Sequence, residues 1–215
     1  VDEAHASLSR LQEASRRTGV DCIVGAIHAN VFGGKKELLN SAAIIRAGGE
    51  IRFVFKKLLP TYDVFDEHRY FHPCPSDCVS PLIEYEGGLR VGVSICEDIW
   101  NDHEFWKDER QYEYDPIQSL VLSGANLIVN ISASPFVATK PGRRVAMLQH
   151  TARRWDMPVL LLNQVGGCDQ IVFDGGSGVF LPDGSVPCVS GWFTECVSIW
   201  DTGTSGTSPA FEAML

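Results

Sequence analysis

The chain contains 215 residues, of which 45% are hydrophobic and 21% charged, which suits one folded domain and excludes a disordered protein. Its net charge of −9 argues against nucleic acid and anionic membrane as partners, because both attract a basic face. The sequence has no apolar run of the ~18 residues that a membrane span needs. Its seven irregularly spaced cysteines indicate reduced thiols, so we expect a cytoplasmic protein.

The first half of the sequence predicts one helix followed by strands. Residues 2–18 predict a helix with Leu8, Leu11 and Ser15 on one face, and Gly19 follows as a stop. The strands that we expect next are a buried strand at 22–27, a hairpin of 41–47 and 51–55, and a buried strand at 89–95.

The second half predicts helices that alternate with strands. Asp115 is a suitable N-cap, Pro116 suits the first helical position, and Gly124 ends the helix. The expected elements that follow are a strand at 125–131, a helix at 143–155, a strand at 159–162, and hairpins that end at 196–200. This order indicates a mixed α/β layered fold in one domain, residues 1–201. Residues 202–215 are rich in Gly, Ser and Thr and predict a flexible tail.

Two residues carry the chemistry that the sequence suggests. Cys96 stands where an apolar strand meets a polar segment, a junction that exposes a side chain and offers backbone N–H groups to an oxyanion. A thiolate attacks carbonyl carbon well when a nearby cation or base lowers its pKa. Packing is the alternative for Cys96, because free cysteine is often buried. Lys56 closes a strand before Pro60 and is either a solvated edge charge or a cation aimed into a site.

Longer blocks of sequence carry a resemblance to a known family. The cysteine and lysine segments together resemble the nitrilase superfamily of carbon–nitrogen hydrolases. Five stretches, in the family's order, resemble the glutaminase domain of bacterial glutamine-dependent NAD synthetases: residues 56–71, 96–100, 131–136, 163–167 and 173–177. This resemblance implies an αββα sandwich and a Glu-Lys-Cys triad.

The resemblance also implies a role for each site residue. Cys96 attacks the side-chain amide of L-glutamine, ammonia leaves, and water hydrolyses the thioester. Lys56, with the backbone N–H after Cys96, stabilises the oxyanion. Lys57 points to the opposite side if the strand persists. The residues implied for the glutamine pocket are Tyr62, Phe65, Glu67, Glu97, Ser134 and Lys140, with Glu67 near the lysine–cysteine pair.

The sequence departs from the family at the triad glutamate. The family carries this glutamate in a Pro-Glu pair upstream of the first predicted helix, and no Pro-Glu pair occurs here. We therefore expect a sandwich that lacks its first strand and has little activity by itself. We also expect the synthetase domain, which uses ATP and magnesium on deamido-NAD, to be missing. Amide hydrolysis itself needs no cofactor, and the resemblance implies a homo-oligomer.

Two alternatives to the glutaminase remain open. A stand-alone nitrilase-fold amidase on another small amide is the first, although residues 62–67 resemble NAD synthetases specifically. A catalytically dead fragment is the second, and the missing glutamate favours it. Trp100 and Trp106 either cover the site or pack in the core.

Other polar and glycine-rich segments have simpler interpretations. Residues 72–78 predict a proline-rich surface loop and no metal site, because structural zinc requires four ligands. Gly166-Gly167 and residues 174–177 predict turns, because they lack the spaced glycines of a phosphate loop. The acidic residues Asp98, Asp102, Glu104, Asp108 and Glu109 predict a solvated loop.

Overall fold

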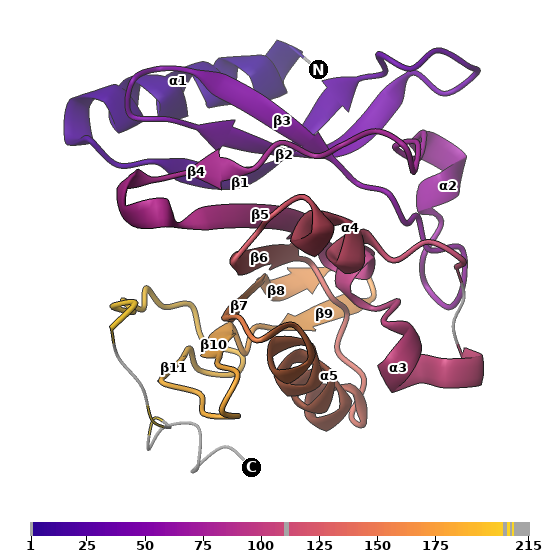
Figure 1. The fold of residues 1–215 in the computed structure, drawn as a ribbon. Coiled ribbons are helices and arrows are strands. Elements are labelled where there is room, and N and C mark those ends of the chain that lie inside the picture. Colours follow the sequence, from indigo (N-terminus) through magenta and orange to yellow (C-terminus); the bar gives the residue numbers. More distant parts are fainter. Residues whose placement is uncertain (1, 110–111, 204–205, 207, 209–215) are drawn as a thin grey trace.

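The computed structural model describes residues 2–109, 112–203, 206 and 208. Figure 1 shows four layers, in which a helix covers one sheet, a second sheet packs beneath it, and further helices cover the far side. Within the described residues, the strands form sheets of order β1-β2-β3 and β11-β10-β7-β6-β5-β4, here called the small and the large sheet, and a hairpin of β8 and β9. The predicted αββα sandwich is confirmed.

The small sheet is antiparallel and lies under α1 (Asp2–Thr18). Its strands are β1 (Cys22–Ala29), β2 (Leu38–Ile45) and β3 (Ile51–Phe55). Side chains of β2 alternate between two cores, since Ala43 and Ile45 pack towards α1 whereas Ala42 and Ile44 pack between the sheets. The predicted hairpin is therefore confirmed, with a first strand that begins earlier than expected.

The first two predicted elements are only partly correct. Leu8 and Ser15 of α1 are buried as expected, whereas Leu11 is exposed. The prediction of a buried strand at 22–27 is wrong in its burial, because no residue of β1 is buried. Among the described strands, β1 pairs only with β2 and forms an edge of the small sheet.

The large sheet supplies the strands that lead into the site. It consists of β4 (Ile83–Glu84), β5 (Arg90–Ile95), β6 (Leu127–Ser132), β7 (Val159–Asn163), β10 (Gly178–Phe180) and β11 (Cys188–Val189). β5, β6 and β7 are parallel, so their carboxyl ends meet along one edge. Their apolar side chains on one side fill the core between the sheets, and those on the other side pack against α4 and α5.

The long helices of the far side begin near the predicted positions. α4 (Pro116–Leu122) is capped by Asp115, whose Oδ1 accepts hydrogen bonds from the N–H groups of Ile117 and Gln118. α5 (Lys140–Trp155) begins three residues before the predicted start. Pro141 is tolerated there because the first N–H groups of a helix have no partner within the helix.

Short elements complete the described part of the chain. They are α2 (Glu67–Tyr70), η1 (Glu86–Gly88), η2 (Cys96–Ile99), α3 (His103–Trp106), η3 (Lys107–Glu109), β8 (Val165–Cys168) and β9 (Ile171–Asp174). Gly166 and Gly167 lie inside β8, so the predicted turn at this pair is wrong. The described residues include no strand after β11, so a strand at 196–200 is also wrong; Val197 is 96% exposed. Most of the predicted tail, 202–215, lies outside the described residues.

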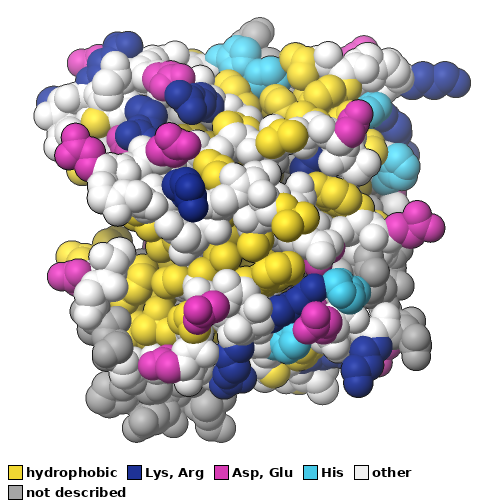
Figure 2. All heavy atoms as spheres, in the orientation of Figure 1, with side chains coloured by type: hydrophobic (Ala, Val, Ile, Leu, Met, Phe, Trp, Pro, Cys, Tyr) yellow, Lys and Arg dark blue, Asp and Glu magenta, His cyan; other side chains and the backbone are white. Residues whose placement is uncertain are grey.

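The surface carries exposed hydrophobic side chains. Figure 2 shows one group of them in the lower left of the view and another through its upper middle, with charged side chains around both. Among the described residues, no helix has both the length and the apolar character needed to cross a membrane.

Candidate active site

Cys96 begins η2 directly after β5, at the carboxyl edge of the parallel strands. Its φ of +46° lies in the left-handed region, which is strained for a residue other than glycine. A strained junction of this kind turns a side chain out of the sheet towards a site. The buried Cys96 side chain lines a cavity of about 310 Å³ and also borders a second cavity of about 290 Å³.

The larger cavity gathers most of the residues that the resemblance implies. Its predicted members are Tyr62, Phe65, Cys96, Glu97, Ser134 and Lys140. Trp100 and Trp106 also line it, and both also pack against the core of the large sheet. Tyr112 and Arg143 are further lining residues that the sequence did not suggest.

Lys56 and Glu67 border the second cavity together with Cys96. Lys56 follows β3 and is only 1% exposed, and its Nζ donates to Glu67 Oε1 at 2.5 Å. Asn40 Nδ2 donates to the other oxygen of Glu67 at 3.2 Å. Burial opposes the charge of Lys56, but the neighbouring Cys96 and Glu67 outweigh it and raise the Lys56 pKa above its usual range. Glu67 therefore holds a charged lysine beside the cysteine.

The larger cavity is lined by side chains of both charges, among them the Glu97 carboxylate and the Lys140 ammonium group. Tyr62 Oη donates to Glu97 Oε1 at 2.7 Å, and burial raises the pKa of Glu97. Lys140 Nζ lies 5.2 Å from the Trp100 ring centroid and 5.8 Å from that of Phe65, and burial lowers the pKa of Lys140. An acid and a base on the walls of one cavity match a small molecule that carries both signs of charge.

The surroundings of Cys96 shift the pKa of its thiol in opposite directions. Burial raises the pKa of the thiol, Lys56 lowers it, and Glu97 raises it further, so the pKa lies above its usual range. By contrast, a hydrogen bond with Ser190 lowers the pKa of the exposed Cys196.

We expect these two cysteines to react with iodoacetamide in a fixed order. At pH 7 Cys196 should be alkylated before Cys96, because only the thiolate reacts and the raised pKa of Cys96 keeps it protonated. As the pH rises towards the pKa of Cys96, its rate should increase about tenfold per pH unit, because the thiolate fraction grows by that factor. Peptide mapping by mass spectrometry between pH 6 and 9 measures both rates. Alkylation of Cys96 first at pH 7 would contradict the expectation.

The prediction that the acidic stretch is a solvated loop is wrong for two of its members. Asp98 and Asp102 are buried, because each carboxylate accepts backbone hydrogen bonds. Asp98 accepts from the N–H groups of Leu58 and Ile95, on the two segments that carry Lys56 and Cys96. Glu104 and Glu109 are exposed as expected, and the Asp108 side chain lies outside the described part.

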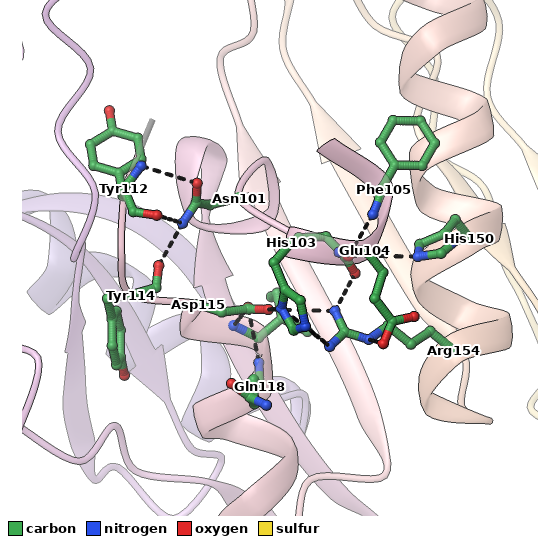
Figure 3. A network of polar contacts seen from close by, with 12 residues as sticks. Asn101, His103, Glu104, Phe105, Tyr112, Tyr114, Asp115, Gln118, His150 and Arg154 are labelled. Atoms are coloured by element: carbon green, nitrogen blue, oxygen red, sulfur yellow. Dashed lines mark hydrogen bonds and ion pairs between the residues drawn. The ribbon is translucent and has the colours of Figure 1, made fainter. Parts of the chain in front are cut away.

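The Arg154 side chain, which is 8% exposed, connects the N-termini of α3 and α4, and Figure 3 shows its contacts. Arg154 Nη1 lies 2.9 Å from Asp102 Oδ2 and 3.6 Å from Asp115 Oδ2, and these aspartates are the N-caps of the two helices. Asn101 Nδ2 donates to the carbonyl of Tyr112 at 2.8 Å. These contacts connect the residues before α3 to the end of the segment between the helices, in which Glu109 and Tyr112 line the larger cavity.

A second buried ion pair supports Ser134. Arg144 Nη2 lies 2.7 Å from Asp174 Oδ2, and Asn163 Nδ2 donates to Asp174 Oδ1 at 3.1 Å. Asn163 Oδ1 in turn accepts from the Ser134 N–H at 2.9 Å. Asn163 thus connects the ion pair to Ser134 in the wall of the larger cavity.

The neighbouring segments have structural roles. Lys57 points away from Lys56, although β3 ends at Phe55 and strand alternation does not extend to it. Its Nζ donates to the carbonyls of Pro75 and Cys78 at 2.9 and 2.5 Å. Cys74 of the predicted surface loop is buried. Among the described residues, no group of three or more His, Cys, Asp or Glu side chains is arranged to hold a metal ion.

Relatives of known identity resemble this chain over most of its length. The glutamine-dependent NAD(+) synthetase of Synechocystis sp. is 42% identical over 166 residues, 77% of this chain and 29% of the relative. That of Thermotoga maritima is 38% identical over 181 residues, 83% of this chain and 28% of the relative. The chain therefore spans under a third of the length of these relatives.

Solved structures show the same fold. The glutamine-dependent NAD+ synthetase of Acinetobacter baumannii, in complex with ADP, matches 94% of this chain and 38% of its own, with a TM-score of 0.70 and 26% identity. A nitrilase-superfamily amidase from Nesterenkonia matches 88% of this chain and 64% of its own, with a TM-score of 0.70 and 21% identity. The carbon–nitrogen hydrolase family matches residues 2–203. Because this match spans nearly the whole sequence, the chain belongs to the carbon–nitrogen hydrolase family.

Proposed function

We propose that this chain hydrolyses the side-chain amide of L-glutamine through a thioester on Cys96. The observation that carries the proposal is a cavity whose walls include Cys96, the Glu97 carboxylate and the Lys140 ammonium group. A simple amide needs neither charge, whereas a free amino acid presents an ammonium and a carboxylate that such groups bind.

The chemistry proceeds in two steps. Cys96 sulfur attacks the amide carbon, and the Lys56 ammonium and the backbone N–H of Glu97 stabilise the resulting oxyanion. The C–N bond breaks, the proton that left the Cys96 thiol passes to the nitrogen, and ammonia departs to leave a thioester. Water then attacks the thioester carbon, which releases glutamate and restores the thiol. Both steps pass through a tetrahedral oxyanion, so the same donors serve both.

The proton-accepting carboxylate is assigned to no described residue of this chain. Glu67 and Glu97 both act on the Cys96 thiol, but Glu67 is held by Lys56 and Glu97 by Tyr62. The resemblance assigns this base to a separate glutamate. We therefore propose that efficient turnover requires that group, and that the residues described here bind substrate and stabilise the oxyanion.

We further propose that the ammonia serves an NAD synthetase domain. The named relatives support this partner, since their names join glutamine to NAD synthesis. ATP and magnesium would act in that domain, and the hydrolysis would need no cofactor. A cytoplasmic location follows from the same role. A homo-oligomer is proposed from the resemblance, and the exposed hydrophobic area in Figure 2 supports it.

Labelling with a glutamine-like chloroketone tests the proposal. We expect Cys96 to gain the mass of the reagent less chloride, and excess L-glutamine to protect it. Cys96→Ala should abolish this labelling, whereas Cys168→Ala removes an exposed thiol and should leave it unchanged. Labelling without protection by glutamine, but with protection by a simple amide, would favour the stand-alone amidase. No labelling of Cys96 in the folded protein would favour a catalytically dead fragment.

The variant Glu97→Gln tests how the substrate is recognised. We expect the KM for glutamine to rise about 10–100-fold, because the amide keeps the shape but loses the charge that binds the substrate ammonium. Steady-state ammonia release measures KM and kcat. The matched variant Tyr62→Phe removes only the hydroxyl and should have a smaller effect. An unchanged KM in Glu97→Gln would contradict this role.

A further inference from the structure

Asp98 is a buried carboxylate that binds backbone on two separate segments. It is 3% exposed, and its Oδ1 accepts from the N–H groups of Lys57 and Leu58 at 3.1 and 2.9 Å. Its Oδ2 accepts from the N–H of Ile95 at 3.2 Å. One side chain therefore connects the end of β3 to the end of β5.

Each bond fixes the backbone next to a reacting group. Ile95 precedes Cys96, and its bond to Asp98 closes the turn in which Cys96 takes its φ of +46°. On the other side, Lys56 N–H still bonds to the carbonyl of Asn40 on β2. β3 ends at Phe55, so the next N–H groups, of Lys57 and Leu58, bond to Asp98 in place of a sheet partner.

We propose that Asp98 is the positioning residue that holds Lys56 and Cys96 at their working separation, a role that rests on the proposed amide hydrolysis. Lys56 follows a strand of the small sheet and Cys96 follows a strand of the large sheet, and the core between these sheets is made of apolar side chains. Hydrogen bonds depend on distance and angle, whereas apolar packing is non-directional. A carboxylate bonded to both segments therefore fixes their relative position more closely than the packing alone.

The carboxylate suits this role better than an amide. Three N–H donors point at its two oxygens, and an amide would offer only one acceptor oxygen. Burial raises the pKa of Asp98 to about 6, although the N–H of Leu58 and the charge of Lys56 lower it, so Asp98 is ionised above pH 7. In Asp98→Asn the oxygen can stay with Lys57 and Leu58, while the NH₂ group faces the Ile95 donor. In Asp98→Ala all three donors lose their partner.

Two measurements on the intact protein test the proposal. The first is the pH profile of Cys96 alkylation by iodoacetamide, which requires no recognition of glutamine. The second is a comparison of how each variant changes kcat and how it changes KM for glutamine. We expect kcat to fall about 10-fold in Asp98→Asn and about 10²-fold in Asp98→Ala, with KM little changed. The alkylation profile should move to higher pH in both variants, because a displaced Lys56 no longer stabilises the thiolate.

The direction in which the pH profile of Cys96 alkylation moves distinguishes a positioning role of Asp98 from a simple effect of its charge. Loss of a negative charge near the thiol would by itself move the profile to lower pH, and that result would overturn the proposal. A profile and kcat equal to wild type, with only a lower melting temperature, would also overturn it, because it would mean a purely structural role.

Asn126→Ala is the matched control. Asn126 braces the opposite end of β5, where its Oδ1 accepts from Arg90 N–H at 2.7 Å and its Nδ2 donates to Gly88 at 2.9 Å. This variant should lower stability without moving the alkylation profile. If wild type releases no ammonia from glutamine, the proposed function fails, and the alkylation profile still decides the role of Asp98.

Discussion

Replacing Lys56 with methionine is expected to lower kcat for glutamine hydrolysis by about 10²–10³-fold, the usual effect of removing one oxyanion donor. KM should change little, because Lys56 borders the second cavity and not the one that holds Glu97 and Lys140. Methionine keeps the length of the buried side chain and removes only the ammonium group. Single-turnover ammonia release in the intact protein measures the effect on the chemical step.

Lys57→Met is the matched control for this variant. Both lysines are buried and adjacent in sequence, but the Lys57 ammonium donates to backbone carbonyls on the opposite side. Its loss leaves those carbonyls without a donor, which costs about 1–3 kcal/mol of stability. We expect Lys57→Met to unfold at a lower temperature with kcat unchanged. Equal kcat losses in both variants would show that general destabilisation, and not the oxyanion, explains the Lys56 effect.

Local signals predicted the central helices and strands well. The parallel strands β5, β6 and β7 are mostly apolar, which is the usual pattern of strands covered on both faces. Asp115 and Pro116 marked the start of α4, because a cap acts on the N–H groups two and three residues away. Such signals lie within a few residues, so a single sequence contains them.

The edge strands of the sheets were harder to predict than the central strands. The apolar residues of β1 suit a covered strand, but only its pairing partners decide whether it is covered. Residues 196–200 are mostly apolar, as a strand would be, yet Val197 is almost fully exposed and the described sheet ends at β11. Contacts with residues distant in the sequence determine both the exposure of β1 and the absence of a strand at 196–200.

The site was predictable only in part for the same reason. The resemblance named Cys96, Lys56 and the pocket residues, and the structure brings most of them around one cavity; their roles stay predictions. Nothing local marked Asp98, since two of its donors lie 40 and 41 positions earlier in the chain. An aspartate among other acidic residues is usually solvated, so its burial depends on tertiary contacts.

Replacing Arg144 with methionine is expected to lower the free energy of unfolding by about 3–5 kcal/mol, because it leaves Asp174 buried without its counter-charge. Arg144 is 1% exposed and Asp174 is 0% exposed, so water does not replace the lost contact. Urea denaturation followed by fluorescence measures the change. The variant should also raise KM, because Asn163 connects Asp174 to the backbone of Ser134 in the cavity wall.

The double variant Arg144→Met/Asp174→Asn separates charge from volume. Asparagine keeps a hydrogen-bonding oxygen for Asn163 but carries no charge, so it should restore part of the lost stability. Arg143→Met is the matched control, because this neighbour on α5 is 53% exposed and pairs with the exposed Glu109. Removing an exposed ion pair changes stability by about 1 kcal/mol or less. Equal losses in Arg143→Met and Arg144→Met would trace the effect to the helix itself, whereas a loss confined to Arg144→Met and relieved in the double variant would trace it to the buried charge of Asp174.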